Sequence, residues 1–294
     1  MVATPIGHLK DISQRAAEVL AAADVVAAED TRRTRQLLTH LGLHKRLISV
    51  RGHNEARQIE LVEQVLDSGQ DVAMASDAGT PLISDPGEKL VSALAEHGYD
   101  VVSVPGPCAA IVALTVSGLP ADRFTFVGFL PRTAGRADDA LAGLVTTPGT
   151  LIFYESPRRL EALLERLLRH FGDRRAVLCR ELTKLHEEVV RGTIATLIER
   201  ARQGTRGEIV VLVEGAAAVR ASQGIDEEAV AEKLRAGVRP RDVAREVAGR
   251  TGLSSRAAYA KVLAIQKRRQ PEDRSASRRA PAHPPLENGA GRQR

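Results

Sequence analysis

The chain has 294 residues, of which 43% are hydrophobic, 27% are charged and only 3% are aromatic. This length is sufficient for two domains with a core built mostly from Ala, Val, Leu and Ile. Two cysteines are too few for a disulfide framework or a zinc site, and no apolar run reaches transmembrane length, so we expect a cytoplasmic protein and no metal site.

The formal net charge of +5 is concentrated at the C-terminal end. Residues 267–294 carry eight Lys or Arg against three acids, which leaves residues 1–266 electrically balanced. The composition of this segment predicts a disordered basic tail that either contacts nucleic acid or remains solvated. The basic character therefore says little about the folded part.

Residues 1–118 alternate short apolar runs with amphipathic segments. We expect strands at 24–28, 47–50, 71–75 and 100–104, separated by helices at about 13–22, 31–40, 55–68 and 88–97. This alternation predicts a parallel, doubly wound sheet. Val2 and Ala3 resemble the last residues of a further strand, which is shorter than the usual length of about five or six residues.

The segment SDAGTPLISDPG, Ser76 to Gly87, follows the strand at 71–75. Its two glycines and two prolines interrupt regular structure, and a helix is expected to restart near Pro86. The loop therefore lies at the carboxyl edge of the sheet, where open α/β folds bind ligands. A plain connection between strand and helix is the alternative, although this loop is longer and more polar than such a connection needs.

Other polar clusters also follow predicted strands. Glu29 to Arg33 can be catalytic or can be a helix cap with solvated arginines, and His53 is placed for proton transfer before the next helix. A loop of small residues enters a helix near Cys108. The charged run from Arg180 to Glu188 is either functional or a solvated hairpin.

The second half differs from the first. Strands at 124–130, 150–155, 176–181, 188–191 and 208–214, with helices at 161–170 and 193–202, predict a mixed sheet over residues 119–221. Residues 131–143 are polar and predict a mobile loop near the cleft. Three short helices in residues 226–266 predict a helix-turn-helix-like module, which either binds nucleic acid or only packs.

The common phosphate-binding loops, metal-ligand spacings and nucleophile elbow are missing from the sequence. The chemistry must therefore come from a cleft between domains, lined by polar loops and holding an organic cofactor. The residues alone thus predict a two-domain α/β enzyme with a small helical appendage.

Eight collinear motifs are more specific: VATPIGHLKDIS, AEDTRRTRQLL, HNE, SDAGTPLISDPG, VPGPCAAIVAL, FVGFLPR, YESPRR and CRELTKLHEE. Together, from Val2 to about Gln266, they resemble the bacterial 16S rRNA (cytidine-2′-O)-methyltransferase family, whose members are tetrapyrrole-methylase-like enzymes using S-adenosylmethionine (SAM). The resemblance implies a two-domain tetrapyrrole-methylase-like fold with SAM in the inter-domain cleft. It also implies a homodimer whose substrate is a ribose in 16S rRNA, at the decoding region of the small ribosomal subunit.

The resemblance also implies roles for individual residues. The expected SAM-binding residues are Pro5, Asp77, Ala78, Gly79, Thr80, Ile83, Cys108, Ala109, Tyr154, Leu182, Leu212 and Glu214. The expected RNA-binding residues are Arg32, Arg33, Arg132, Arg158 and Arg180. Candidates for the general base or for orienting the hydroxyl are Glu29, Asp30, His53, Glu181, Lys184 and His186, and we favour Lys184 with Glu181 because they share a strand end.

Two departures from the family pattern stand out. His8 occupies a position that is usually Asn, and the family's first strand starts several residues before the position of Met1, so we expect the first strand to be truncated here. Two other functions compete with the favoured one: methylation of a corrin-type tetrapyrrole, and a non-catalytic role as an RNA- or ribosome-binding protein.

Overall fold

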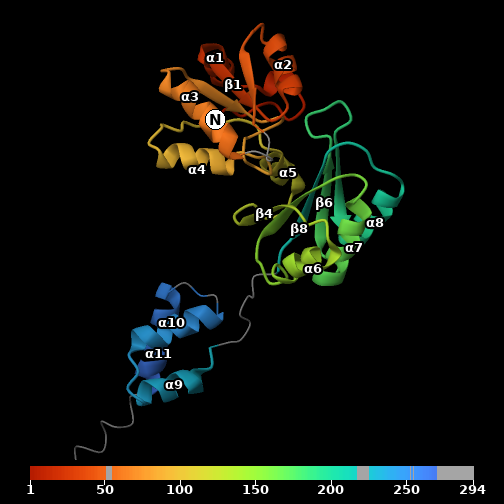
Figure 1. Cartoon of the computed structure of the whole chain (residues 1–294). Coiled ribbons are helices and arrows are strands. Elements are labelled where there is room, and N and C mark those ends of the chain that lie inside the picture. The colour runs from red at the N-terminus through yellow and green to blue at the C-terminus, as the bar shows by residue number, and fades with distance from the viewer. Residues whose placement is uncertain (51–54, 217–224, 252, 254, 270–294) are drawn as a thin grey trace, which may run out of the picture. The chain divides into compact units, whose positions relative to one another are not determined.

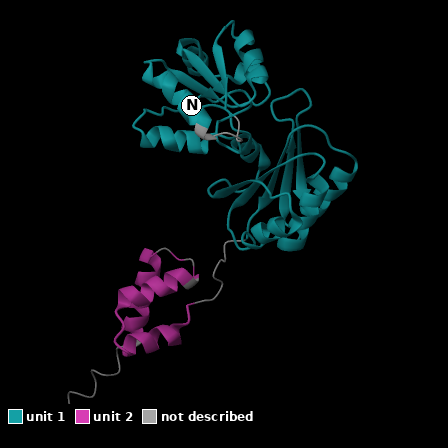
Figure 2. Cartoon of the chain, viewed as in Figure 1, with its two compact units in different colours: residues 1–217 teal, residues 218–294 magenta. Residues whose placement is uncertain are grey.

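The structure is a computed structural model that describes residues 1–50, 55–216, 225–251, 253 and 255–269. The chain divides into two compact units, Met1–Ala217 and Ala218–Arg294 (Figure 2). The first unit holds two sheets and the second is helical (Figure 1).

The first sheet is parallel, with the strand order β2-β1-β3, as the sequence predicted. Alternate residues of a strand face opposite sides of a sheet, and here each side is covered by two helices. Val26 and Ala73 share a core with α1 and α2, whereas Val25, Ala27 and Met74 share a core with α3 and α4. The elements are β1 (Val25–Ala28), β2 (Arg46–Ser49), β3 (Val72–Ala75), the 3₁₀ helix η1 (Leu9–Asp11), α1 (Gln14–Ala22), α2 (Thr31–His40), α3 (Glu55–Asp67) and α4 (Glu88–Glu96).

The N-terminal residues lie beside β3. Val2 forms parallel bridges to both Ala75 and Val104, and the Val2 amide donates to the Met74 carbonyl at 2.8 Å. The predicted strand at 100–104 is wrong, because only Val104 within it forms a bridge. One bridged residue does not make a ladder, so this segment is extended but irregular.

The second sheet has the order β4-β5-β8-β6-β7 and is mixed, as predicted. β4 and β5 are parallel, whereas β8 runs antiparallel to both β5 and β6, and β6 and β7 form the predicted hairpin. The strands are β4 (Phe124–Phe129), β5 (Thr150–Glu155), β6 (Arg175–Arg180), β7 (Glu188–Thr193) and β8 (Ile209–Glu214).

Helices cover both faces of this sheet. α6 (Ala134–Ala142), α7 (Leu160–Phe171) and α8 (Ile194–Arg202) enclose the core around Phe153 and Leu178, and α5 (Ala109–Ser117) covers the opposite face around Ile152 and Leu212. The prediction of a mobile loop at 131–143 is wrong, because residues 134–142 form α6. Ala137 and Leu141, one turn apart, are buried against the sheet and stabilise this helix.

The helical unit contains α9 (Glu227–Arg235), α10 (Pro240–Thr251) and α11 (Ser255–Arg269), close to the predicted ranges. Asp226 caps α9 by accepting a hydrogen bond from the Ala229 amide at 3.0 Å. Val230, Val243, Val262 and Ile265 belong to a core of its own. Within the described ranges, none of the helices in either unit has both the length and the hydropathy needed to cross a bilayer.

Candidate active site at the strand ends of the first unit

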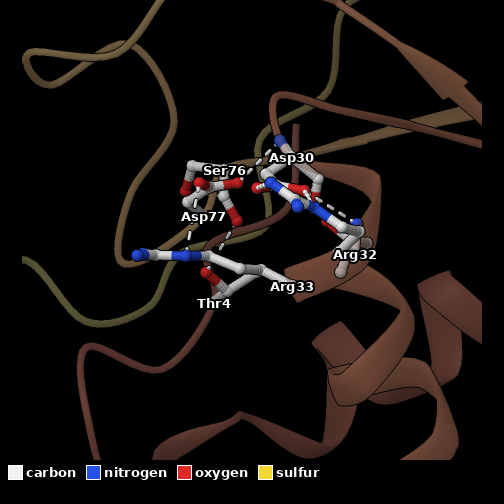
Figure 3. A network of polar contacts seen from close by, with 7 residues as sticks. Thr4, Asp30, Arg32, Arg33, Ser76 and Asp77 are labelled. Carbon is white, nitrogen blue, oxygen red and sulfur yellow. Dashed lines mark hydrogen bonds and ion pairs between the residues drawn. The ribbon is translucent and has the colours of Figure 1, made fainter.

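The loop after β3 is fastened to the N-terminal segment. The Thr4 amide donates to the Gly79 carbonyl at 2.8 Å, the Gly79 amide donates back at 3.0 Å, and the Thr4 hydroxyl donates to the Ser76 carbonyl (Figure 3). The Thr80 hydroxyl donates to the carbonyl of Pro107, at the entrance of α5. These contacts hold three strand-end segments together at one edge of the sheet.

Backbone strain is concentrated at the same place. Among the described residues, the non-glycine residues with left-handed φ are Leu82, Ser84, Glu181 and Thr183, with φ between 52° and 73°. Two of them belong to the loop after β3, and the other two belong to the β6–β7 hairpin. Such conformations cost free energy and persist where the surroundings impose them, often at functional sites.

These segments enclose a cavity of about 360 Å³. One wall is formed by the loop after β3 and the start of α5, and the other by the second sheet. The predicted cofactor residues that line it are Ala78, Gly79, Thr80, Ile83, Cys108, Ala109, Tyr154 and Leu182. Its volume lies in the range of about 300–1,000 Å³ that is typical of small-molecule sites.

Tyr154 anchors the second-sheet wall. Its ring packs edge-on against Phe126 and Phe129, with ring centroids 5.0 and 5.7 Å away, and its hydroxyl accepts a hydrogen bond from the Ala110 amide at 3.0 Å. Burial raises the pKa of the Tyr154 hydroxyl. Tyr154 is therefore a neutral group that connects β5 to the first turn of α5.

Leu212 and Glu214, two of the residues expected to bind the cofactor, do not line this cavity. Leu212 is fully buried in the core beneath α5, and Glu214 lies 3.7 Å from Arg175 at the far end of β8. The reason is the antiparallel pairing of β8 with β5, which places Val210 opposite Tyr154 and Glu214 opposite Thr150. Ile209 and Val210 line the cavity in place of Leu212 and Glu214.

A second cavity of about 400 Å³ shares Ile6, Ala78 and Glu208 with the first. It is lined by the predicted residues Pro5 and Asp77 and by the cations Arg33 and Lys184. The chain approaches itself closely here, because a Cβ on Gly7 would lie 2.5 Å from Cγ of Lys184. A more polar cavity with cationic side chains therefore adjoins the apolar one.

Lys184 and Glu181 are indeed together, on the β6–β7 hairpin. The Lys184 ammonium donates to Glu181 at 2.9 Å and to Glu208 at 3.0 Å. Burial opposes the charge, but these carboxylates raise the pKa of Lys184 above its usual value. A hydrogen bond from the Glu208 amide, with help from Lys184, lowers the pKa of Glu181. Both groups are therefore charged at neutral pH, and the hairpin is not simply solvated.

The cluster after β1 is organised around two aspartates. Asp30 caps α2 by accepting from the Arg32 amide at 2.9 Å, and its carboxylate pairs with the Arg32 guanidinium at 3.0 Å (Figure 3). Asp77 accepts from the Asp30 amide at 2.9 Å and lies 3.9 Å from Arg33. Glu29 is half-buried beside them. The helix-capping interpretation thus accounts for Asp30.

The remaining candidates are dispersed. Arg180 pairs with Glu188 at 2.9 Å across the hairpin, Arg132 and Arg158 are exposed near the ends of β4 and β5, and His186 is exposed on the hairpin. His53 lies outside the described residues. No group of three or more His, Cys, Asp or Glu suited to a metal occurs in the described part of the chain.

The capping role of Asp30 can be separated from a catalytic one. We expect Asp30→Ala to lower the free energy of unfolding by about 1 kcal/mol, because the first turn of α2 loses its cap. Asp30→Asn, which keeps a capping oxygen, should be close to the parent in chemical denaturation. A large loss of activity in Asp30→Asn at unchanged stability would contradict a purely structural role.

Asp85 belongs to the segment SDAGTPLISDPG, but the sequence interpretation gave it no role, and it missed Glu208. Asp85 lines the first cavity, and its Oδ2 atom is buried without a hydrogen-bond partner among the described residues. Glu208 belongs to both cavities and binds Lys184. The position of Glu208 directly before β8 could have indicated it only if the direction of that strand had been known.

Known proteins are similar in sequence to this chain over most of its length. Proteins named "Ribosomal RNA small subunit methyltransferase I" are 44% identical in Mesorhizobium japonicum, covering 90% of this chain and 91% of the relative, and 48% identical in Escherichia coli O157:H7, covering 73% and 77%. The counterpart in Mycobacterium tuberculosis is 44% identical over 91% of this chain and 94% of its own length.

Solved structures share the fold at lower identity. A cobalt precorrin-4 methyltransferase superposes with a TM-score of 0.57 at 18% identity, covering 72% of this chain and 93% of its own. A uroporphyrin-III-C-methyltransferase from Thermus thermophilus gives 0.53 at 24% identity, covering 72% and 92%. Residues 1–198 match the family described as Tetrapyrrole (Corrin/Porphyrin) Methylases. With this match and these relatives, the chain belongs to the tetrapyrrole methylase family, and it is a methyltransferase.

Proposed function

We propose that this protein transfers a methyl group from SAM to the ribose 2′-hydroxyl of a cytidine in 16S rRNA, at the decoding region of the small ribosomal subunit. The observation that carries the proposal is the identity of 44–48% to relatives named as small-subunit rRNA methyltransferases, over most of the chain. We further propose that the enzyme acts in the cytoplasm as a homodimer. Light scattering would test the oligomeric state by measuring the molar mass in solution.

The first cavity fits SAM. Its lining is mainly apolar, and a Cβ on Gly79, whose φ is +85°, would lie 3.1 Å from Ile6, which also lines the cavity. Gly79, Thr80, Cys108, Ala109 and Tyr154 would hold the cofactor, which supplies a methyl group on a positively charged sulfur. Leu182 and Ile83 would exclude water from it. Methyl transfer depends mostly on holding the hydroxyl oxygen, the methyl carbon and the sulfur nearly in line. The hydrogen bonds that join the strand-end segments would keep such a geometry fixed.

The second cavity suits the nucleotide that carries the hydroxyl. Arg33 and Lys184 line it, and both cavities share Ile6, Ala78 and Glu208, so a ribose in one would face a methyl donor in the other. Arg32, Arg132, Arg158 and Arg180 are proposed to contact phosphates further along the RNA. Phosphate contacts set register and orientation, and they make binding dependent on salt.

The arginine assignments can be tested through this salt dependence. Arg132→Ala and Arg158→Ala should each weaken binding to small subunits and reduce the slope of log K against log salt by about one. Arg169→Ala, an exposed arginine on α7 outside the proposed surface, is the matched control. If filter-binding titrations gave the same slope of log K against log salt for all three variants, Arg132 and Arg158 would not contact the RNA phosphates.

The proposed reaction is tested by transfer of labelled methyl from SAM to small subunits isolated from a strain lacking this gene. Label on the 2′-oxygen of one cytidine, mapped by nuclease digestion and mass spectrometry, is the expected result. Bound SAM without transfer to subunits or free rRNA would favour a tetrapyrrole substrate, and failure to bind SAM would favour a non-catalytic role in RNA binding.

A further inference from the structure

Asp85 differs from the other acids of the first cavity. Three carboxylates line that cavity, from Asp85, Glu155 and Glu208. Glu155 accepts from the Ser156 amide at 2.7 Å and pairs with Arg159 at 3.1 Å, and Glu208 binds Lys184. Asp85 Oδ2, by contrast, is buried and accepts no hydrogen bond within the described chain. A buried polar atom without a partner costs free energy, so its presence needs a reason.

The electrostatic surroundings of Asp85 are unfavourable to its charge. Burial first, and then the neighbouring carboxylates of Glu29 and Asp77, raise the pKa of Asp85 to about 6. The titratable groups that face Asp85 from the strand ends and loops around the cavity are those of Glu29, Asp77, Cys108, Tyr154, Glu155 and Glu208. None of these groups is cationic, so Asp85 has no counter-ion among the described residues that line the cavity.

The other acid–base candidates are less suited to taking a proton. Lys184 is held as a cation by two carboxylates, Glu181 is stabilised as an anion by the Glu208 amide and Lys184, and Asp30 caps a helix. A general base works best when it is deprotonated at the working pH yet still basic, with a pKa near that pH. Among the described candidates whose pKa is shifted, Asp85 has a pKa that is close to the working pH and leaves the carboxylate deprotonated there.

We propose that Asp85 is the catalytic base of the methyl transfer, with the carboxylate that lines the first cavity accepting the hydrogen bond and then the proton of a ribose 2′-hydroxyl that reaches into this cavity from the second. This role rests on the proposed function. As the O–H bond breaks, the proton passes to the Asp85 carboxylate and the oxygen forms its bond to the methyl carbon. The electron pair of the carbon–sulfur bond stays on sulfur, so the charges of carboxylate and sulfonium are both neutralised.

An alternative role for the same carboxylate is to bind the ammonium of the cofactor's amino-acid part. The two roles differ in what a neutral replacement does. A base can be removed with little effect on cofactor affinity, whereas loss of an ion pair to the cofactor weakens its binding directly. Asp85→Asn, which keeps the size of the side chain and removes its basicity, therefore separates them.

The experiment compares Asp85→Asn with the parent protein and with Glu88→Gln, a matched control in the first turn of α4, where the side chain is exposed. Single-turnover methyl transfer to small subunits should fall by about 10²–10⁴-fold in Asp85→Asn. The rate of the parent should rise with pH up to about 6 and then stay constant, because Asp85 becomes deprotonated in this range. The residual rate of Asp85→Asn should not show this rise. Calorimetric affinity for SAM should stay within about three-fold of the parent, which is less than 1 kcal/mol, and Glu88→Gln should match the parent throughout.

Thermal unfolding gives a readout that is independent of activity. Because the folded pKa of Asp85 is above that of the unfolded chain, the folded state binds more protons between about pH 4 and 6, and stability falls as pH rises through this window. Asp85→Asn should therefore melt at a higher temperature than the parent at pH 7.5, with the difference vanishing below about pH 4.

Three results would overturn the role of Asp85: an unchanged rate, an unchanged pH profile of the residual rate, or a large loss of SAM affinity. Failure of the parent to methylate subunits while it binds SAM is a different result. It would reject the proposed substrate, and with it the ribose as the proton donor, while the pH-dependent stability difference would still report the isolated carboxylate.

Discussion

Tyr154→Ala should abolish measurable SAM binding and lower the free energy of unfolding by about 3 kcal/mol, at the low end for truncating a buried aromatic residue. The ring is half-buried and packs edge-on against Phe126 and Phe129, so its removal opens the wall of the first cavity. The start of α5 also loses its connection to β5. Calorimetry with SAM and chemical denaturation would measure the two effects.

Tyr154→Phe is the matched control, because it keeps the ring and removes only the hydroxyl. The Ala110 amide then loses its acceptor at 3.0 Å. We expect a cost of about 1 kcal/mol in stability, typical of a lost hydrogen bond, and SAM affinity within about ten-fold of the parent. If Tyr154→Ala bound SAM as well as Tyr154→Phe does, the first cavity would not be the cofactor site.

Most of the fold could be predicted because local patterns determine it. Apolar runs such as Val25 to Ala28 are buried on both faces, and turn residues mark their ends. The exceptions depend on partners distant in sequence. Residues 100–104 look like a strand, yet only Val104 meets a bridging partner, and α6 was missed because Gly135 and two aspartates obscure the buried pair Ala137 and Leu141.

The site was predictable in location more than in chemistry. The glycines and prolines around Gly79 and directly before Cys108 mark ligand loops by their backbone requirements, and these loops do line the cavity. Strand direction is not encoded locally, so the sequence interpretation chose Leu212 and Glu214 at one end of β8, whereas Ile209 and Val210 at the other end line this cavity. Charge states depend on neighbours in space. Lys184 has two carboxylate partners, whereas Oδ2 of Asp85 has no hydrogen-bond partner among the described residues, and spacing along the chain reveals neither.

Lys184→Ala should lower kcat/KM for subunit methylation by about 100-fold, with most of the loss in KM, because the proposed ion pair between the ammonium and a phosphate of the bound RNA is lost. Lys184 lines the second cavity and is held between Glu181 and Glu208. We propose that it positions a phosphate of the target nucleotide. Its removal would also leave two uncompensated carboxylates facing the RNA.

Under this proposal Lys184→Arg should retain most of the activity, because the arginine keeps the positive charge. Its planar guanidinium fits the carboxylates of Glu181 and Glu208 differently from an ammonium. The pKa of Lys184 is raised, so its stabilising contribution is fully present below about pH 10 and is lost only as pH rises through the folded pKa. The effect of Lys184→Ala should therefore be constant between about pH 6 and 9. If Lys184 were instead the base, its replacement would change the shape of the pH–rate profile, and Lys184→Arg would be as inactive as Lys184→Ala because a guanidinium does not give up its proton in this range. The two replacements, measured over pH, thus decide whether this lysine binds the substrate or takes its proton.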